Sequence, residues 1–309
     1  MIFSENNWYN WQYGDGPVNG RHIPNKPFKT NYGRCNEDIG SYKDELLKVA
    51  RSTIDTFPNQ KFKLLFSGGS DSEVVLRSYL AINHPVEVVI YRYENDFNLY
   101  DVSYAVTICN MLGVEYEIID FNLTKFYEND AERYAELSEI DRPAALPYLN
   151  FLEMSDDIPI LGQGDPWWFR KQGIDYSVKG EWGYGDMEVF TGSSKFLIAI
   201  NKLGIPTWFK WRPGLVWAYT NLEWFKLLTN DGIIGKSGVS STKLQGYKEV
   251  FPDMLSRSKA TGFEKIGTLV SEFETFLSNK NQGLVYRQEC IRTYDELQTD
   301  ILGFDKFNN

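Results

Sequence analysis

A phosphate-binding loop is indicated by one short run of residues, Ser67-Gly68-Gly69-Ser70-Asp71-Ser72. The adjacent glycines let the backbone approach an anion closely, and the serines add hydroxyl donors around it. Asp71 would repel a bare phosphate, but its carboxylate can hold a magnesium ion against the phosphate oxygens. The run therefore predicts a site for a phosphate group and Mg²⁺, with Asp71 as the metal ligand. A glycine-rich turn with a helix cap is the structural alternative.

The elements around this run predict how it is positioned. A short apolar stretch at 62–66 precedes it, and helical spacing of apolar residues resumes at 74–80. Further strands are predicted at 86–91, 115–121 and 158–161, with helices at 99–112, 124–138 and 144–154. This alternation predicts an α/β fold whose open, mainly parallel sheet carries helices on both faces. Ligands of such sheets bind at the carboxyl ends of the strands, where this loop is expected.

The motif Phe66-Ser67-Gly68-Gly69-Ser70-Asp71-Ser72 resembles the SGGxDS loop of the PP-loop (N-type) ATP pyrophosphatases, which include asparagine, NAD and GMP synthetases and tRNA thiolases. The resemblance implies an adenine nucleotide alpha hydrolase-like fold, with ATP and Mg²⁺ as cofactors. It also implies a first step in which ATP adenylylates a substrate oxygen and releases pyrophosphate, after which a nucleophile displaces AMP. The loop would then bind ATP, and the backbone near Ile90 and Tyr91 would contact adenine.

A second segment, Ile160-Leu161-Gly162-Gln163-Gly164-Asp165, is similar to the GEGxDE signature of asparagine and β-lactam synthetases. This similarity implies that Gly162 and Gly164 contribute to the nucleotide site and that Asp165 is a second metal ligand, opposite Asp71. The segment has one residue fewer than the family before the aspartate, and Gln163 replaces the family's glutamate. Asparagine-forming chemistry is therefore not implied by this segment.

A weaker resemblance covers a later stretch, 247–252 and 257–263, which is similar to the loop that supplies a lysine to the transition state in these synthetases. It implies Lys259 as a catalytic residue, with Lys265 as the second candidate. A lysine there would neutralise charge that builds up on the α-phosphate and pyrophosphate. A solvated surface lysine is the alternative interpretation.

Residues just past the second segment are further candidates for ligand contact. Arg170 and Lys171 could hold pyrophosphate, and solvated positions are the alternative for both. The adjacent pair Trp167-Trp168 could stack on a flat, nucleobase-like substrate.

We expect the chain to divide into three parts. Residues 1–58 would form an aromatic N-terminal cap and an amphipathic helix from Asn36 to about Phe57, and 59–175 the ATP pyrophosphatase domain. Residues 176–309 would form a mainly helical region, with a hairpin at 182–190 and helices at 193–204, 215–229 and 263–278.

Composition restricts the possible partners and compartment. The chain has 42 acidic and 32 basic residues, a net charge of −10, which argues against broad nucleic-acid binding. With no membrane-length apolar run and no leader-like N-terminus, we expect a cytoplasmic protein. Cys35, Cys109 and Cys290 form no CxxC pair, and Cys109 lies on an apolar helix face that predicts burial. His22 and His84 stand beside turn sequence and are predicted to be solvated, so a histidine-based metal site is not expected.

The favoured function is an ATP-dependent, AMP-forming ligase in which an amine nucleophile displaces AMP from an adenylylated small molecule. Ammonia or the amine would come from solution or from a separate donor, because the sequence offers no glutaminase domain before the loop. Two alternatives stay open. One is a sulfur-inserting thiolase of the same superfamily, for which Cys290 is the cysteine outside the predicted core and cap. The other is a nucleotide-binding module without catalysis, which Gln163 keeps open.

Overall fold

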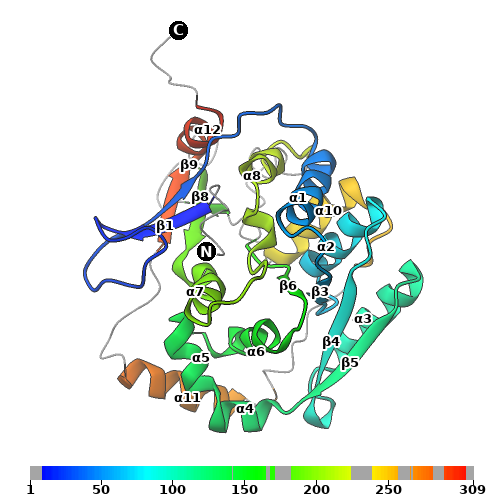
Figure 1. Cartoon of the computed structure of the whole chain (residues 1–309), viewed down its shortest axis with the longest axis vertical. Coiled ribbons are helices and arrows are strands. Elements are labelled where there is room, and N and C mark those ends of the chain that lie inside the picture. The colour runs from blue at the N-terminus through cyan, green and yellow to red at the C-terminus, as the bar shows by residue number, and fades with distance from the viewer. Residues whose placement is uncertain are drawn as a thin grey trace.

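The computed structural model describes residues 9–140, 142–164, 168–170, 182–223, 239–256, 265, 267–280 and 289–303. Its central element is a four-stranded sheet in the order β5-β4-β3-β6, in which each pair of neighbours is parallel (Figure 1). The strands are β3 (Phe62–Leu65), β4 (Glu87–Tyr93), β5 (Tyr116–Phe121) and β6 (Ile158–Leu161). Because β3 pairs with β4 on one side and β6 on the other, the strand order reverses at β3. The loops after β3 and β6 therefore meet at the carboxyl edge, where ligands bind in open α/β sheets.

Helices cover both faces of this sheet. The helices of one face are α1 (Tyr42–Thr56), α2 (Ser70–Ala81) and α3 (Leu99–Leu112), and those of the other are α4 (Leu123–Asn129), α5 (Ala131–Ser138), α6 (Pro147–Met154) and α7 (Gly192–Ala199). Successive strand residues enter opposite cores: Leu64 and Ile160 join the first, Leu65 and Leu161 the second. The predicted α/β fold with helices on both faces is confirmed.

Local capping explains where the helices differ from prediction. Helix α1 begins at Tyr42, later than the predicted Asn36, because Ser41 and Asp44 form a reciprocal capping box. The predicted helix at 124–138 is two helices, α4 and α5, separated at Asp130. Helix α3 keeps its predicted bounds, since Gly113 ends it in a left-handed conformation with φ +66°.

Two antiparallel sheets accompany the parallel one. They are the hairpin of β1 (Tyr9–Tyr13) with β2 (Phe28–Tyr32), and the sheet β7-β8-β9, built from Trp168–Arg170, Trp182–Met187 and Glu289–Thr293. The predicted hairpin at 182–190 is instead one strand, β8, which pairs with β7 and β9 and leads into a 3-10 turn at Glu188–Thr191. In Figure 1 the hairpin and β9 lie across the molecule from β4 and β5.

The remaining helices are α8 (Pro213–Tyr219), α10 (Val239–Val250), α11 (Gly267–Lys280) and α12 (Tyr294–Leu302). Of the helices predicted in this region, 193–204 corresponds to α7, and 263–278 corresponds to α11. Helix α8 accounts for the start of 215–229, whose end lies outside the described residues. Across the described ranges, every helix is too short or too polar to cross a membrane.

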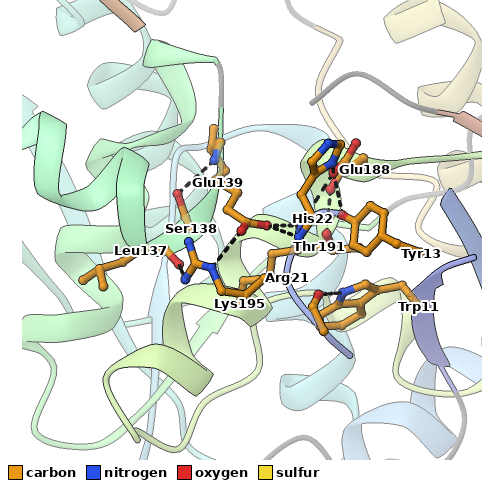
Figure 2. Close-up of polar contacts among 12 residues, drawn as sticks. Trp11, Tyr13, Arg21, His22, Leu137, Ser138, Glu139, Glu188, Thr191 and Lys195 are labelled. Atoms are coloured by element: carbon orange, nitrogen blue, oxygen red, sulfur yellow. Dashed lines mark hydrogen bonds and ion pairs between the residues drawn. The ribbon is translucent and has the colours of Figure 1, made fainter. Parts of the chain in front are cut away.

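Buried charged groups join the N-terminal hairpin to α5 and α7 (Figure 2). The side chain of His22 is only 6% exposed, and its Nδ1 lies 2.9 Å from Glu188 Oε1. The prediction of a solvated histidine is therefore wrong for His22, because a segment distant in sequence covers it. Lys195 Nζ donates to the Tyr13 hydroxyl at 2.7 Å and lies 2.7 Å from Glu139 Oε2. The hairpin is thus anchored by the polar contacts of His22 and Tyr13 as well as by its aromatic face.

Candidate functional site

The loop 67–72 connects β3 to α2 at the point where the strand order reverses. Gly69 is the N-cap of α2, and no side chain caps the first helical turn. The backbone N–H groups of that turn therefore face out of the loop, where an anion could accept from them. Ser67 Oγ accepts from the Gly69 amide at 3.2 Å, and Ser72 Oγ donates to the Gly69 carbonyl at 3.0 Å. These bonds link Ser67 and Ser72 to Gly69, at the start of α2.

Close backbone contacts explain why glycines stand at two positions. Gly68 has φ +64°, and a Cβ placed on it would lie 2.7 Å from the backbone nitrogen of Ala105 in α3. A Cβ placed on Gly162, in the loop after β6, would lie 3.0 Å from Ser72 Cα. Both positions exclude a side chain unless the backbone shifts. The second loop is therefore packed directly against the first.

Gly164 lies at the other end of the loop after β6. Its φ is +85°, and a Cβ there would lie 3.0 Å from Cγ of Lys210, a buried residue of the 3-10 turn Trp208–Lys210. Between these glycines, Gln163 Oε1 accepts from Ser193 Oγ at 3.1 Å. Because the amide oxygen is used in this way, the amide nitrogen of Gln163 is directed elsewhere as a donor.

The carboxylate of Asp71 is held from α10. The Tyr247 hydroxyl donates to Asp71 Oδ1 at 2.7 Å, and Lys243 Nζ donates to Oδ2 at 3.3 Å. The Asp71 side chain is 28% exposed and that of Lys243 is 11% exposed, so the pair is only partly screened by water. A positive charge therefore stands within reach of whatever the loop binds.

Packing fixes α10 in this position. The ring of Tyr247 is stacked between Tyr42, at a centroid distance of 6.4 Å, and Phe209, at 6.1 Å. Just beyond α10, Asp253 accepts from Arg77 of α2 at 2.9 and 3.0 Å, and Arg77 also donates to Glu73 at 2.7 Å. The bond to Arg77 lowers the pKa of Asp253, so this carboxylate is charged at neutral pH.

A cavity opens beside the loop, between the ends of β3 and β4 and the start of α3. Its volume is about 50 Å³, within a wider hollow of about 530 Å³ that includes open solvent. Its lining is Leu65, Phe66, Ser67, Ile90, Tyr91, Tyr93, Asn98, Asp101, Val102 and Tyr148. The two residues predicted to lie near adenine, Ile90 and Tyr91, are thus placed in this cavity next to Ser67.

Other predicted site residues lie elsewhere or outside the described ranges. Four of the predicted residues lie outside the described ranges: Asp165, Trp167, Lys171 and Lys259. Arg170 lies in β7, opposite Trp182, and its side chain is outside the described part of the structure. Lys265 is exposed.

Sequence reasoning missed the two α10 residues that contact Asp71. Lys243 and Tyr247 are four residues apart, so they share one face of a helix. This spacing is visible in the sequence. The contacts with Asp71, however, span 172 and 176 residues, and no local pattern indicates that this helix face packs against a loop so far away in the chain.

The loop offers one carboxylate, that of Asp71, as a ligand for a magnesium ion. Mg²⁺ in nucleotide sites is commonly held by one or two carboxylates together with phosphate oxygens, and Asp71 offers such a carboxylate at the loop. Within the described ranges, no three His, Cys, Asp or Glu side chains converge as metal ligands. The remaining ligands of an ion at Asp71 would therefore come from phosphate and water.

No protein-family model and no curated protein sequence matches the chain. Among solved structures, it is similar to an NMN synthetase from Francisella tularensis, with 16% identity, 79% of this chain and 95% of that chain covered, and a TM-score of 0.33. An NH3-dependent NAD synthetase from Campylobacter jejuni, in complex with the nitrate ion, has 13% identity, coverage of 81% and 97%, and a TM-score of 0.32. A glutamine-dependent NAD+ synthetase from Acinetobacter baumannii, in complex with ADP, has 12% identity, coverage of 84% and 51%, and a TM-score of 0.31. These similarities are too low to assign a family or an activity to the chain.

Proposed function

We propose that the chain is an ATP-dependent synthetase that adenylylates an oxygen of a small-molecule substrate, releases pyrophosphate and then lets an amine displace AMP. The observation that carries this proposal is the loop 67–72. It follows a parallel strand at the reversal of strand order, opens a helix, and bears a carboxylate paired with a buried lysine. Its sequence resembles the loop that binds ATP in PP-loop ATP pyrophosphatases.

Binding of the triphosphate would use groups already in place. The uncapped N–H groups at the start of α2 and the hydroxyl of Ser67 would donate to phosphate oxygens. Asp71 would hold Mg²⁺, which would neutralise phosphate charge and orient the leaving pyrophosphate. Lys243 would then share its charge between Asp71 and the phosphates.

The adenylylation step depends on stabilising the negative charge of the leaving pyrophosphate. The substrate oxygen attacks the α-phosphorus, the bond to the β-phosphate oxygen breaks, and negative charge builds up on pyrophosphate. The helix N-terminus and Lys243 face that charge and stabilise it without reorganisation. Gln163 carries an amide, so it can orient a substrate through its N–H groups but cannot remove a proton.

The cysteines give little support to the sulfur-inserting alternative. Burial raises the pKa of Cys109 to about 11, and burial together with the charge of Glu45 raises the pKa of Cys35. Both thiols are therefore protonated at neutral pH and are poor nucleophiles. Cys290 lies in β9 and is partly buried.

Product analysis tests the proposal. ATP labelled at the α-phosphate is incubated with Mg²⁺, the full chain and a panel of carboxylates with ammonia or primary amines. We expect labelled AMP and an equal amount of pyrophosphate with one of these pairs, lost in Asp71→Asn and retained in Asp55→Asn, a matched change at an exposed position of α1. Labelled ADP would contradict the proposal. ATP binding with no cleavage across the panel would favour the nucleotide-binding module.

A further inference from the structure

Asp71 is held differently at its two carboxylate oxygens. Oδ1 accepts from the Tyr247 hydroxyl at 2.7 Å, and the Tyr247 ring is fully buried between two other aromatic rings. Oδ2 accepts from Lys243 Nζ at 3.3 Å, which is long for a bond between two charged groups. A lysine side chain also rotates about several bonds, so its ammonium can leave this oxygen while the helix stays in place. Oδ1 is therefore fixed by a rigid donor, and Oδ2 is the oxygen that can change its partner.

A metal ion bound to Asp71 would use the same oxygen as the lysine. Mg²⁺ binds about 2 Å from its oxygen ligands, so an ion on Oδ2 would lie at most about 5 Å from the Lys243 ammonium. The Lys243 side chain is only 11% exposed, which leaves little water to screen the two positive charges. Like charges at such a distance repel each other. Lys243 and a divalent ion therefore compete for Oδ2.

The surroundings of this pair do not favour an additional cation. Asp71 is the second residue of α2, whose N-terminus carries a partial positive charge. Helix α10, which carries Lys243, lies beside α2 (Figure 1). The neighbouring carboxylates of Glu73 and Asp253 both accept from Arg77, so a cation already balances them. A divalent ion on its own would thus add positive charge to a region whose acidic groups are already paired.

A triphosphate at the loop 67–72 would change this balance. It brings several negative charges, and its oxygens accept from an ammonium group as readily as they bind a metal ion. The Lys243 ammonium can then pass from Asp71 Oδ2 to a phosphate oxygen. That movement leaves Oδ2 to the ion, while the lysine keeps a negatively charged partner.

We propose that Lys243 and a divalent ion are alternative partners of Asp71 Oδ2, and that the triphosphate decides between them. Without a triphosphate, the lysine excludes the ion. With a triphosphate, the ammonium moves to phosphate and the ion binds Asp71, so metal and nucleotide enter the site together. This inference rests on the proposed function for the triphosphate, whereas the competition for Oδ2 involves the protein and the metal alone.

Manganese binding without nucleotide tests the competition. Mn²⁺ stands in for Mg²⁺, and the decline of the paramagnetic resonance signal of free Mn²⁺ reports its binding to the full chain. We expect Lys243→Met to bind Mn²⁺ at least about tenfold more tightly than the unmodified protein, because the substitution removes a like charge from beside the ion. The same affinity in both proteins, or weaker binding by the variant, would overturn the proposal.

Three further variants locate the effect. Asp71→Asn combined with Lys243→Met should lose the gain, which would place the ion at Asp71. Lys243→Arg keeps the positive charge and should bind Mn²⁺ as weakly as the unmodified protein. Lys248→Met should also bind it weakly, because Lys248 lies on the same helix but donates to Ser256 Oγ. A gain that survives without the Asp71 carboxylate, or that Lys248→Met shares, would contradict the proposal. Misfolding does not explain a gain of affinity at one carboxylate.

Calorimetry of ATP in the presence of EDTA tests the movement of the lysine to phosphate. With metal removed, ATP should bind Lys243→Met about tenfold less tightly than the unmodified protein, because the phosphates lose an ammonium partner. Equal ATP affinity in the two proteins would overturn this part of the proposal. Failure of ATP to bind the unmodified protein, with Mg²⁺ as well as without it, would count against the proposed function, and the manganese titrations would still decide the competition at Oδ2.

Discussion

The hydroxyl of Tyr247 donates a 2.7 Å hydrogen bond to Oδ1 of Asp71, across 176 residues of sequence. The Tyr247 ring is fully buried and stacked between Tyr42 and Phe209, so the donor has little freedom to move. This relationship ties helix α10 to the loop that opens α2. It also orients the carboxylate that would hold Mg²⁺.

Removing that hydroxyl should weaken the metal-dependent part of nucleotide binding. Tyr247→Phe keeps the stacked ring but loses the donor, and loss of a partner that orients a metal ligand typically costs about 10- to 100-fold in metal affinity. We expect the Mg²⁺-dependent gain in ATP affinity to fall by about tenfold, measured by calorimetry with and without Mg²⁺. Tyr116→Phe on β5 is the control and should behave like the unmodified protein. An unchanged Mg²⁺ dependence in Tyr247→Phe would argue that Asp71 is oriented by other means.

Lys243 should contribute charge to the triphosphate. Lys243→Met removes a buried ammonium near Asp71, so we expect MgATP affinity to fall by about 10- to 100-fold and to depend less on salt concentration. Lys248→Met is a matched control, because Lys248 lies on the same helix and donates to Ser256 Oγ instead. Equal effects of the two substitutions would show that Lys243 has no special role.

The contact between the two loops should not tolerate a side chain. In Gly162→Ala, the new Cβ would meet the backbone at Ser72, and overpacking of this kind commonly costs about 1–3 kcal/mol of unfolding free energy. We expect a matching loss in urea denaturation and weaker MgATP binding. Gly267→Ala is the control, because a Cβ there meets nothing within 4 Å. Full stability of Gly162→Ala would contradict the close contact.

These contacts show which parts the sequence could predict and which it could not. The parallel sheet, the loop and its helix rest on local periodicity and on glycine chemistry, and β3, β6 and α3 lie within a residue or two of their predicted bounds. The partners of Asp71 and His22 come from segments far away in the chain, and no local pattern specifies such a pairing. The ends of α1 and α4 depend on side-chain capping and on one break at Asp130, which helical periodicity does not reveal.

The buried pair Glu139–Lys195, beside the N-terminal hairpin, should make the free energy of unfolding depend on pH. Burial alone would raise the pKa of Glu139, but the charge and hydrogen bond of Lys195 outweigh it and hold the pKa below its usual value. A carboxylate with a lowered folded-state pKa contributes stability above its unfolded pKa of about 4.3 and loses it as the pH falls through the folded value. We therefore expect the unfolding free energy to fall below about pH 5, measured by urea denaturation.

The contribution of this one carboxylate is isolated by comparison. Glu139→Gln should lower stability at neutral pH and flatten the decline in acid, whereas Glu117→Gln, at an exposed position of β5, should leave both unchanged. A decline of the same steepness in Glu139→Gln and the unmodified protein would place the acid sensitivity in other groups.

The most direct measurement is a calorimetric titration of ATP into the full chain, with and without Mg²⁺, in the unmodified protein and in Asp71→Asn. The account predicts measurable ATP binding that Mg²⁺ strengthens by about tenfold or more, and loss of that strengthening in Asp71→Asn. Asp55→Asn should keep it. Absence of ATP binding, or an Mg²⁺ effect that survives in Asp71→Asn, would contradict the claim that the loop 67–72 holds the triphosphate through a metal at Asp71.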